Sequence, residues 1–586
     1  MRPVTVVKAV GVLMLVAAAI PGSVTAGSQS PAAPEASIEG VAWRVDVAAH
    51  GYAVEGGTVV ATGSHGATGI DVRSGATRWR YEAPSGSAIA SWAVTGGAVT
   101  LAMDDAPEDI TAGSYTRWQV VGLDATTGQR LWGPMRQREE LLPPIDYVLH
   151  GSSPEQIVAG GGMVIVPGYP GVKGVDARTG GLAWAQPLDD VAGGLCDVLG
   201  GGDFPGTIRP LVAASGGIVA VAAGCRDGQV VIGVDLRTGD VRWTTSLPGD
   251  APDRLLVDGA ILVGQGTRST ILDVDGRVRH EGVLPPRERV MAVVGDYAVV
   301  VGTDGASDPL VAVDLRDGRT PWSASRPSTE SALALRRGTY RGLTAVDGAV
   351  LGYRLEAGGR VSGRQSMGIP DENLLPAAID RIDPATGAVR SVAVPVVGAT
   401  SWITAVNGLL LLASVRGLTA LRLGAGDLPS TAAAPAPPDR WPDACALVSA
   451  EQLAALRPNT NPTLDKQYAE VLGLAIPTPV QCHYTDPNGE AFLVVVIRWV
   501  ADDPRGAEVL ATAAHRLSAG MNLWEENPED PMLPAVGVWA FGDATDSVTL
   551  RAGTVIAEVR SWDFTTVPAV EVARLVGEKL TAMGYR

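Results

Sequence analysis

Short apolar runs separated by glycine-centred turns recur from residue 41 to residue 423. One run, Val231 to Val234, leads into a turn at Asp235 and then into an alternating stretch, Val241 to Trp243. This order predicts a strand, a tight turn and a second strand. The spacing leaves no room for an intervening helix, so we expect an all-β fold over this part of the chain.

The turns share a motif in which Asp is followed by Gly four residues later and by Trp eight residues later. The motif residues are Asp71, Gly75 and Trp79; Asp124, Gly128 and Trp132; Asp176, Gly180 and Trp184; Asp235, Gly239 and Trp243; and Asp314, Gly318 and Trp322. A further copy, Asp383 and Gly387, has Ser391 in place of Trp, and a shortened copy runs from Asp273 through Gly276 to His280. We interpret Asp and Gly as turn residues, because a carboxylate accepts hydrogen bonds from nearby amides and Gly tolerates positive φ. We interpret Trp as a plate that packs between sheets.

Each motif follows further apolar strands, for example residues 97–101 and 216–222, so one repeat has roughly four short strands. After the last motif, residues 407–413 and 417–423 supply two strands without a Trp strand. The missing strand occurs at the other end, where Trp43 lies in residues 41–47 with no motif before it. We therefore predict an eight-bladed β-propeller over residues 41–423, with four-stranded blades, whose last blade is closed by the N-terminal strand.

The repeats resemble the PQQ-like (pyrroloquinoline quinone-like) propeller repeat, whose signature is an Asp-x-x-Thr-Gly-x-x-x-Trp hairpin. The resemblance implies a ring shared by quinoprotein dehydrogenases and by non-catalytic relatives such as an outer-membrane assembly lipoprotein. The dehydrogenases typically carry two adjacent Cys over the quinone and calcium ligands from central strands. Here no two Cys are adjacent and no such ligand set can be matched. The resemblance is therefore closer to the non-catalytic scaffolds.

The longest segments between strands are predicted on one face of the ring. They are residues 104–114, 133–154, 187–210, 325–341 and 357–376. Insertions on one face of a repeat ring typically build a binding surface, with drift in surface loops as the alternative. Arginines gather near this face: Arg326, Arg336, Arg337, Arg341, Arg354 and Arg360. They indicate either solvated loops or an anchor for an acidic partner.

The four Cys follow a predicted secretion signal, so we expect two disulfides. Cys196 and Cys225 are both predicted on the loop-rich face, which favours a bond between them. Cys445 and Cys482 then pair in the C-terminal region. The Cys spacing indicates neither a zinc site nor a redox C-x-x-C motif.

Residues 1–26 are typical of a signal peptide. Arg2 and Lys8 form a basic region before an apolar run over residues 9–20, and a small-residue site predicts cleavage after Ala26. The run is shorter than a transmembrane helix requires, although an uncleaved anchor stays open. Residues 27–40 are predicted to be a flexible tether. We expect a secreted or extracytoplasmic protein, with cell-surface association left open.

The C-terminal part of the chain has a different pattern. Residues 424–442, rich in Pro and Ala, are predicted to be a linker. Beyond them we expect helices over 449–456, 503–518 and 568–583, and strands over 491–499, 536–541, 547–551 and 554–562, which predict a small α+β domain over residues 443–586. Its start at Asp443, with Cys445 and the later Cys482 and Tyr484, resembles a domain of unknown function in exported actinobacterial proteins.

The charge balance is acidic, with 46 Lys and Arg against 63 Asp and Glu. Such a surface repels phosphate backbones and anionic lipids, so nucleic acid is excluded as a partner class. The six His are scattered, and no metal, nucleotide or hydrolase motif occurs. Asp273 to Gly276 resembles the start of a calcium loop, but Leu284 stands where the loop needs an acid. No catalytic, cofactor-binding or metal-binding residue is predicted.

These observations favour a non-catalytic, monomeric propeller that binds a protein or an envelope polymer through the loop-rich face. One alternative is a quinoprotein oxidoreductase, which would require pyrroloquinoline quinone and calcium. The other is an extracytoplasmic sensor in which the C-terminal domain binds or gates a small ligand on the ring.

Overall fold

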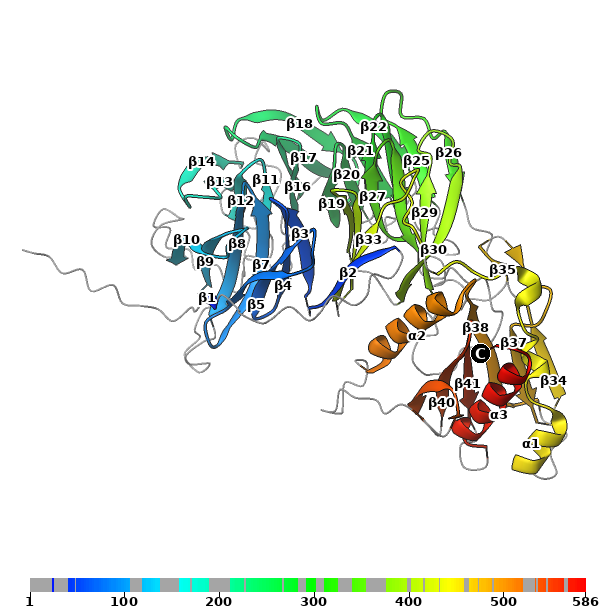
Figure 1. Cartoon of the computed structure of the whole chain (residues 1–586). Helices are drawn as coiled ribbons and strands as arrows, with labels where there is room; N and C mark the ends of the chain where they lie inside the picture. The colour runs from blue at the N-terminus through cyan, green and yellow to red at the C-terminus, as the bar shows by residue number, and fades with distance from the viewer. Residues whose placement is uncertain are drawn as a thin grey trace, which may run out of the picture.

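The structure is a computed structural model of the whole chain (Figure 1). It describes residues 24–25, 40–47, 49–105, 118–136, 157–168, 171–188, 211–225, 228–265, 268–282, 291–301, 310–324, 340–354, 376–397, 402–414, 417–431, 433–457, 463–468, 470–472, 474–486, 489–519, 533, 536–543, 546–562 and 567–585.

The strands up to Arg422 form eight antiparallel sheets, which we number in chain order. Sheet 1 has β3 (Gly51–Glu55), β4 (Thr58–Gly63), β5 (Gly66–Asp71) and β6 (Thr77–Glu82), with β1 (Val24–Thr25) at its outer edge. Sheet 2 has β7 (Ser87–Thr95), β8 (Ala98–Asp105), β9 (Trp118–Asp124) and β10 (Arg130–Arg136). Sheet 3 has β11 (Val158–Gly160), β12 (Met163–Gly168), β13 (Gly171–Asp176) and β14 (Leu182–Pro187). Sheet 4 has β15 (Leu211–Ser215), β16 (Ile218–Cys225), β17 (Gly228–Asp235) and β18 (Val241–Leu247).

The next three sheets repeat this order. Sheet 5 has β19 (Arg254–Val257), β20 (Ile261–Gln265), β21 (Arg268–Leu272) and β22 (Val278–Gly282). Sheet 6 has β23 (Met291–Val294), β24 (Tyr297–Val301), β25 (Leu310–Asp314) and β26 (Trp322–Ala324). Sheet 7 has β27 (Tyr340–Val346), β28 (Ala349–Arg354), β29 (Pro376–Ile382) and β30 (Val389–Val397).

Sheet 8 combines the two ends of this region. It contains β31 (Trp402–Val406), β32 (Leu409–Ser414), β33 (Gly417–Arg422) and, as its outer strand, β2 (Val41–Asp46). Strand β2 pairs with β33 antiparallel, with Arg44 opposite Thr419. The N-terminal Trp strand thus completes the last sheet, as the sequence predicted.

The sheets pack face to face through their middle strands. Strands such as β16 and β17 are rich in Val and Ile and are almost wholly buried, because both faces of a sheet contact a neighbouring sheet. The outer strand β18 instead alternates between partly buried and exposed residues. The first strands of successive sheets lie beside one another from β3 to β19 and from β23 to β31.

Sheets 8 and 1 also pack together, although they lie at opposite ends of the region. Val59 and Ile70 of sheet 1 share a buried cluster with Leu411 and Leu418 of sheet 8. The ring of Tyr52 on β3 stacks on the ring of Trp402 on β31, with centroids 5.8 Å apart. The last sheet is therefore in contact with the first.

The C-terminal part has its own six-stranded antiparallel sheet. Its strands, in spatial order, are β34 (Thr463–Gln467), β37 (Gln481–Thr485), β38 (Ala491–Val500), β41 (Val555–Ser561), β40 (Ser547–Ala552) and β39 (Trp539–Asp543). A separate hairpin has β35 (Glu470–Val471) and β36 (Leu474–Ala475), and the helices are η4 (Pro438–Arg440), η5 (Ala444–Ala446), α1 (Ala450–Leu456), α2 (Pro504–Ala519) and α3 (Ala569–Ala582). Ser449 caps α1 through a reciprocal pair of hydrogen bonds with Gln452.

The predicted elements of this part all correspond to observed ones, whereas β34, β37 and the hairpin were not predicted. The predicted linker is packed rather than free. Ala436 N donates to Val500 O at 2.8 Å, and Asp502 N donates to Ala434 O at 2.9 Å. Trp441 is buried with its ring edge-on to Trp499.

Helix α2 lies between the C-terminal sheet and β30 of sheet 7 (Figure 1). Ala378 and Ala393 of sheet 7 belong to the same buried cluster as Leu510 and Ala514 of α2. Thr431 Oγ1 also donates to Ala393 O. The C-terminal part is therefore anchored on sheet 7.

Over the described part of the chain, no helix is long and apolar enough to cross a membrane. The predicted signal peptide (residues 1–26) and tether (residues 27–40) lie almost entirely outside the described residues.

Candidate functional site

The motif aspartates hold the turns between the third and fourth strands. Asp235 Oδ1 accepts hydrogen bonds from the amides of Arg237 and Thr238, both at 2.9 Å, and Arg242 Nε donates to Oδ2 at 3.0 Å. Asp71, Asp124, Asp176 and Asp383 accept the same two amide bonds. The bond from the Thr238 amide, followed by that from Arg242, lowers the pKa of Asp235 to about 2. These carboxylates are ionised and engaged within their own turns.

The motif tryptophans join each sheet to the next. The indole N–H donates to the carbonyl of the residue that follows the motif Asp of the next sheet. The pairs are Trp43 with Val72 (2.9 Å), Trp79 with Ala125 (3.0 Å), Trp132 with Ala177 (2.8 Å), Trp184 with Leu236 (3.1 Å), Trp243 with Val274 (2.9 Å) and Trp322 with Pro384 (2.9 Å). These bonds give the tryptophans a structural role in joining neighbouring sheets.

The motif glycines receive the rings. Gly239 has φ of +80°, and a Cβ placed on it would lie 2.7 Å from the ring of Trp184. The turn therefore requires Gly both for its backbone conformation and for the close approach of the neighbouring sheet. Gly75, Gly128 and Gly387 receive Trp43, Trp79 and Trp322 in the same way.

Two sheets depart from this scheme. In sheet 5, His280 takes the Trp position, and its Nδ1 lies 3.2 Å from the carbonyl oxygen of Gly318 in sheet 6. In sheet 7 the position belongs to Ser391, which lies opposite Asp380.

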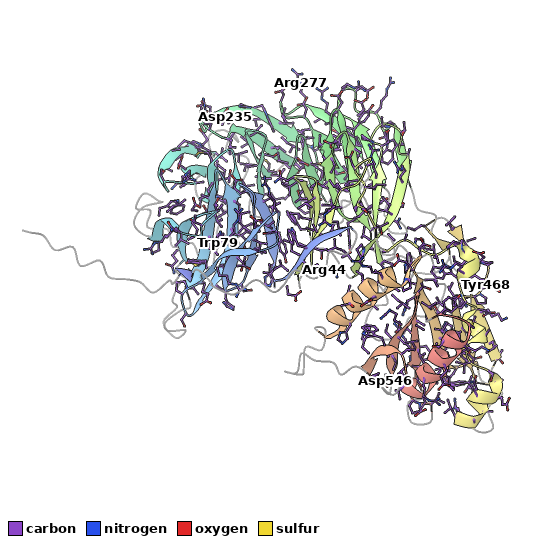
Figure 2. The ribbon with its side chains drawn as sticks, in the orientation of Figure 1. Arg44, Trp79, Asp235, Arg277, Tyr468 and Asp546 are labelled. Atoms are coloured by element: carbon purple, nitrogen blue, oxygen red, sulfur yellow. A yellow bond between two sulfur atoms is a disulfide. The ribbon has the colours of Figure 1, made fainter. Side chains whose placement is uncertain are left out.

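The connections divide the eight sheets into two unlike faces. The turn face carries the turns between first and second strands and, in sheets 1 to 7, between third and fourth strands, and all of these turns are short. The loop face carries the connections between second and third strands and between successive sheets. Figure 2 shows Asp235 and Arg277 of the turn face on the side away from the C-terminal part.

The five predicted long segments all connect strand ends on the loop face. They lie largely outside the described residues, as do Arg326, Arg336, Arg337 and Arg360, while Arg341 is described for its backbone in β27 alone. The proposed binding role of these arginines stays a prediction.

Arg354 corrects one expectation. The sequence placed it among the arginines of the loop-rich face, but it is 7% exposed at the end of β28. Its Nε and Nη2 donate to Asp380 at 2.7 and 2.9 Å, and Tyr340 Oη donates to Asp380 Oδ2 at 2.6 Å. Nothing in the sequence around Arg354 indicated this ion pair, because Asp380 lies 26 residues further along the chain.

Burial alone would raise the pKa of the Asp380 carboxyl. The Arg354 guanidinium beside it, together with hydrogen bonds from Arg354, Ser391 and Tyr340, instead holds that pKa below its ordinary value. Asp380 is therefore a buried carboxylate. The signal that could have revealed it is the charged residue within the apolar run of β29, combined with the loss of Trp from β30.

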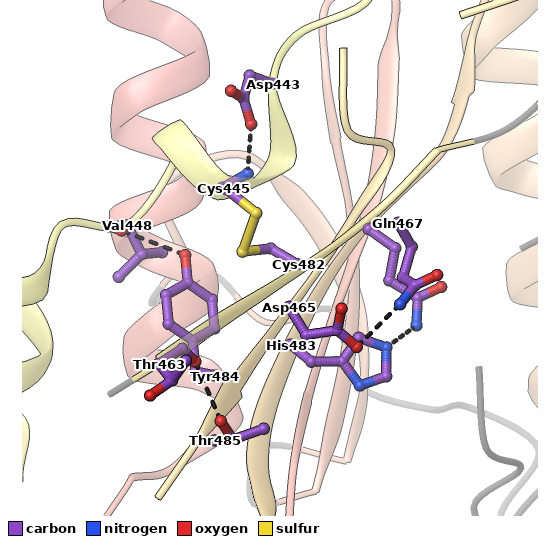
Figure 3. The surroundings of a disulfide bond; sticks show 11 residues. Asp443, Cys445, Val448, Thr463, Asp465, Gln467, Cys482, His483, Tyr484 and Thr485 are labelled. Carbon is purple, nitrogen blue, oxygen red and sulfur yellow. Dashed lines mark hydrogen bonds between the residues drawn. A yellow bond between two sulfur atoms is a disulfide. The ribbon is translucent and has the colours of Figure 1, made fainter. Parts of the chain in front are cut away.

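The described cysteines, Cys225, Cys445 and Cys482, take part in disulfides. Cys445 and Cys482 form the predicted disulfide between η5 and β37 (Figure 3). Close by, Tyr484 Oη donates to Val448 O at 3.2 Å, which further ties the start of this domain to its sheet. Cys225 takes part in a disulfide, and Cys196, its predicted partner, lies outside the described residues.

Among the described residues, no group of three or more His, Cys, Asp or Glu is placed to hold a metal ion. The arrangement built by the repeats is structural, and it presents one face of short turns and one face of long connections. Such a geometry is suited to binding a macromolecule across the loop face.

Comparison with known proteins gives two results. A model of the family described as outer membrane protein assembly factor BamB matches residues 36–194 and 170–354. No curated protein matches the chain.

Solved structures show only distant likeness. BamB from Moraxella catarrhalis is 16% identical, covering 66% of this chain and 99% of that chain, with a TM-score of 0.38. The computationally designed Ika8 protein is 14% identical over 66% of this chain and 98% of its own, with a TM-score of 0.38. Sqt1 from Saccharomyces cerevisiae is 11% identical over 66% of this chain and 99% of its own, with a TM-score of 0.39.

The matched residues contain the Asp, Gly and Trp positions that join sheets 1 to 6, and they span more than half of the sequence. The chain therefore belongs to the PQQ-like propeller family described as outer membrane protein assembly factor BamB.

Proposed function

We propose that this protein is an extracytoplasmic, non-catalytic eight-bladed β-propeller that binds a protein or an envelope polymer through its loop face. The observation that carries the proposal is the contrast between the two faces. On the turn face, the motif residues are engaged in their own turns and in neighbouring sheets. All of the long connections join strand ends on the loop face. The shape of that face is therefore set by these connections and not by the repeated motif.

The contacts between the last and first sheets support a closed ring. Strand β2 supplies the outer strand of sheet 8, and its Trp43 donates to Val72 O in sheet 1. The stacked rings of Tyr52 and Trp402 join the innermost strands of the same two sheets. A ring closed in this way leaves no first or last sheet exposed.

Family membership supports an envelope role. The family description names a factor in outer membrane protein assembly. The sequence before β2 is typical of a secretion signal, and the disulfide between Cys445 and Cys482 suits an oxidising compartment.

Site-specific photo-crosslinking tests the binding face. A photoreactive residue is placed at Arg336 or Ser85 for the loop face and at Arg237 or Thr126 for the turn face. Each variant of residues 27–586 is incubated with the solubilised envelope fraction of the source cells. We expect a discrete adduct from the loop-face positions alone. Adducts from the turn face alone would overturn the proposal.

Calorimetric titration with pyrroloquinoline quinone, with and without calcium, tests the oxidoreductase alternative. We expect no binding heat at tens of micromolar quinone, a concentration well above that needed for a tight site. Tight one-to-one binding that depends on calcium would contradict the non-catalytic assignment and call for alcohol and sugar oxidation assays.

A further inference from the structure

The joint between sheets 7 and 8 has no motif Trp. In sheets 1 to 4, 6 and 8, the motif Trp donates to a carbonyl of the next sheet, and in sheet 5 the ring of His280 lies against the carbonyl of Gly318. Sheet 7 has Ser391 at this sequence position, and its hydroxyl group hydrogen-bonds Asp380 of the same sheet. Other residues must therefore hold sheet 7 against sheet 8.

The chain turns back on itself directly after β33. Leu423 pairs with Pro429 in an antiparallel bridge, and Ser430 N donates to Arg422 O at 3.1 Å. The returning chain therefore runs beside the end of β33, where a fourth strand of sheet 8 would begin. We call residues 424–431 the strap.

The strap meets the N-terminal strand at the end of β33. Arg422 N donates to Gly40 O at 2.8 Å, just before β2 begins at Val41. Gly40 has φ of +92°, and a Cβ placed on it would lie 1.9 Å from Ser430 O. This position requires Gly, because the strap passes directly against the start of β2.

Leu428 of the strap packs between the two sheets. It is 5% exposed and belongs to the buried cluster that contains Val394 of sheet 7 and Val41 and Leu421 of sheet 8. Trp184 has the same relation to sheets 3 and 4, because its ring belongs to the cluster that those two sheets share. Leu428 therefore supplies the apolar contact that a motif Trp supplies at other joints.

Two polar side chains connect this region to the outer strand of sheet 7. Thr431 Oγ1 of the strap donates to Ala393 O, and Arg44 Nη2 of β2 donates to Pro395 O. Both acceptors are backbone carbonyls of β30. Arg44 lies on the side of the eight sheets that faces the C-terminal part (Figure 2). The two bonds join sheets 7 and 8, as the indole N–H groups join other neighbouring sheets.

We propose that the strap holds the joint between sheets 7 and 8 closed, with Leu428 in place of the Trp ring and Thr431 in place of the indole N–H. When the strap is loosened, this joint opens before the others, and β2 separates from β30. The inference goes beyond the proposed function, because it concerns how the eight sheets are held and needs no partner. It gives the first part of the predicted linker a role in the propeller itself.

The test uses residues 27–586 with the variants L428A and T431V. The first removes the apolar contact, and the second removes the hydroxyl group at nearly constant shape. L428M keeps the volume of the side chain and serves as the conservative variant. L188A is the matched control, because Leu188 is fully buried in the cluster of sheets 3 and 4, which also contains Trp184.

Hydrogen exchange is measured over β2, over β30 and over sheets 3 and 4. We expect exchange of β2 and β30 to rise about tenfold in L428A and less in T431V, with L428M close to wild type. In L188A we expect exchange to rise in sheets 3 and 4 and to stay unchanged in β2 and β30.

Unchanged exchange of β2 and β30 in both L428A and T431V would overturn the inference. A rise of equal size in all eight sheets of L428A would also overturn it, since Leu428 would then contribute to overall stability and not to one joint. If L428A does not fold, T431V decides alone: a rise confined to β2 and β30 supports the strap, and no rise contradicts it.

Discussion

Ser391 lies opposite Asp380 across β30 and β29, at the register where Trp79 lies opposite Gly69 in sheet 1. The exchange coincides with a change in topology. A motif Trp needs the turn of the following sheet as its hydrogen-bond acceptor, and sheet 8 has no such turn. Its third strand, β33, leads into the linker, and its outer strand comes from the N-terminal end.

Removing the indole donor should weaken the joint between sheets 3 and 4. W184F keeps an aromatic ring and loses the bond to Leu236 O, so we expect a loss of about 1 kcal/mol in unfolding free energy, against about 3–5 kcal/mol for W184A. W499F is the control, since Trp499 is fully buried but its indole N–H has no hydrogen-bond partner. Urea titration measures both, and an equal loss in W184F and W499F after correction for ring size would contradict the role of the bond.

Alanine at Gly239 should be more harmful than alanine at Gly217. Both residues have positive φ, +80° and +85°, so both substitutions cost about 1 kcal/mol in backbone strain. A Cβ at Gly239 also meets the Trp184 ring, whereas nothing lies within 4 Å of one at Gly217. We expect an additional loss of about 1–3 kcal/mol for G239A in denaturant titration. Similar values for the two variants would show that the neighbouring ring moves freely.

Stability should fall in strong acid through the turn carboxylates. Hydrogen bonds and nearby arginines lower the pKa values of Asp71 and Asp235 to about 2 in the folded protein, below the ordinary value of 3.8. A lowered folded-state pKa gives stability that is fully present above about pH 4 and is lost as the pH falls towards 2. We expect Tm to drop over that window, and the Tm gap between wild type and D235N to shrink in parallel. Calorimetry at pH 7, 4, 3 and 2 checks this; a constant gap would refute it.

A charge at the α2 contact should release the C-terminal part from sheet 7. Ala393 is 1% exposed against α2, so A393E buries a carboxylate without a partner unless the contact opens. We expect a larger maximum dimension in small-angle scattering, with the Tm of the eight sheets little changed. V389E is the control on the same strand, because Val389 is 46% exposed. An unchanged scattering profile in A393E would show that the anchoring lies elsewhere.

The repeats made much of the fold predictable. A motif that recurs with fixed spacing shows where each hairpin turns, and the isolated Trp43 strand indicated how the last sheet is completed. In the C-terminal part, the apolar run over residues 491–499 predicted β38, Ala491–Val500. Strand β34 was missed because it is an edge strand with mostly exposed polar residues, so it has no alternation to detect.

Contacts between distant parts were not predictable in the same way. Ala393 and α2 are joined by small apolar side chains that carry no sequence pattern. Asp380 and Tyr340 are 40 residues apart, and their bond becomes visible only when the strands are aligned. The arginines of the loop face were noted as a group, but Arg354 could be separated from them only by its burial.

Because β2 pairs with β33, the order of synthesis determines when the eighth sheet can form. Residues 41–46 leave the ribosome well before their partner, residues 417–422, which follows only after all the strands between have been made. Sheet 8 is thus the last of the eight sheets to be completed, and a chain that ends before residue 417 lacks the strand with which β2 pairs. Because β2 must pair with β33, the eighth sheet is complete only when every strand between them is present.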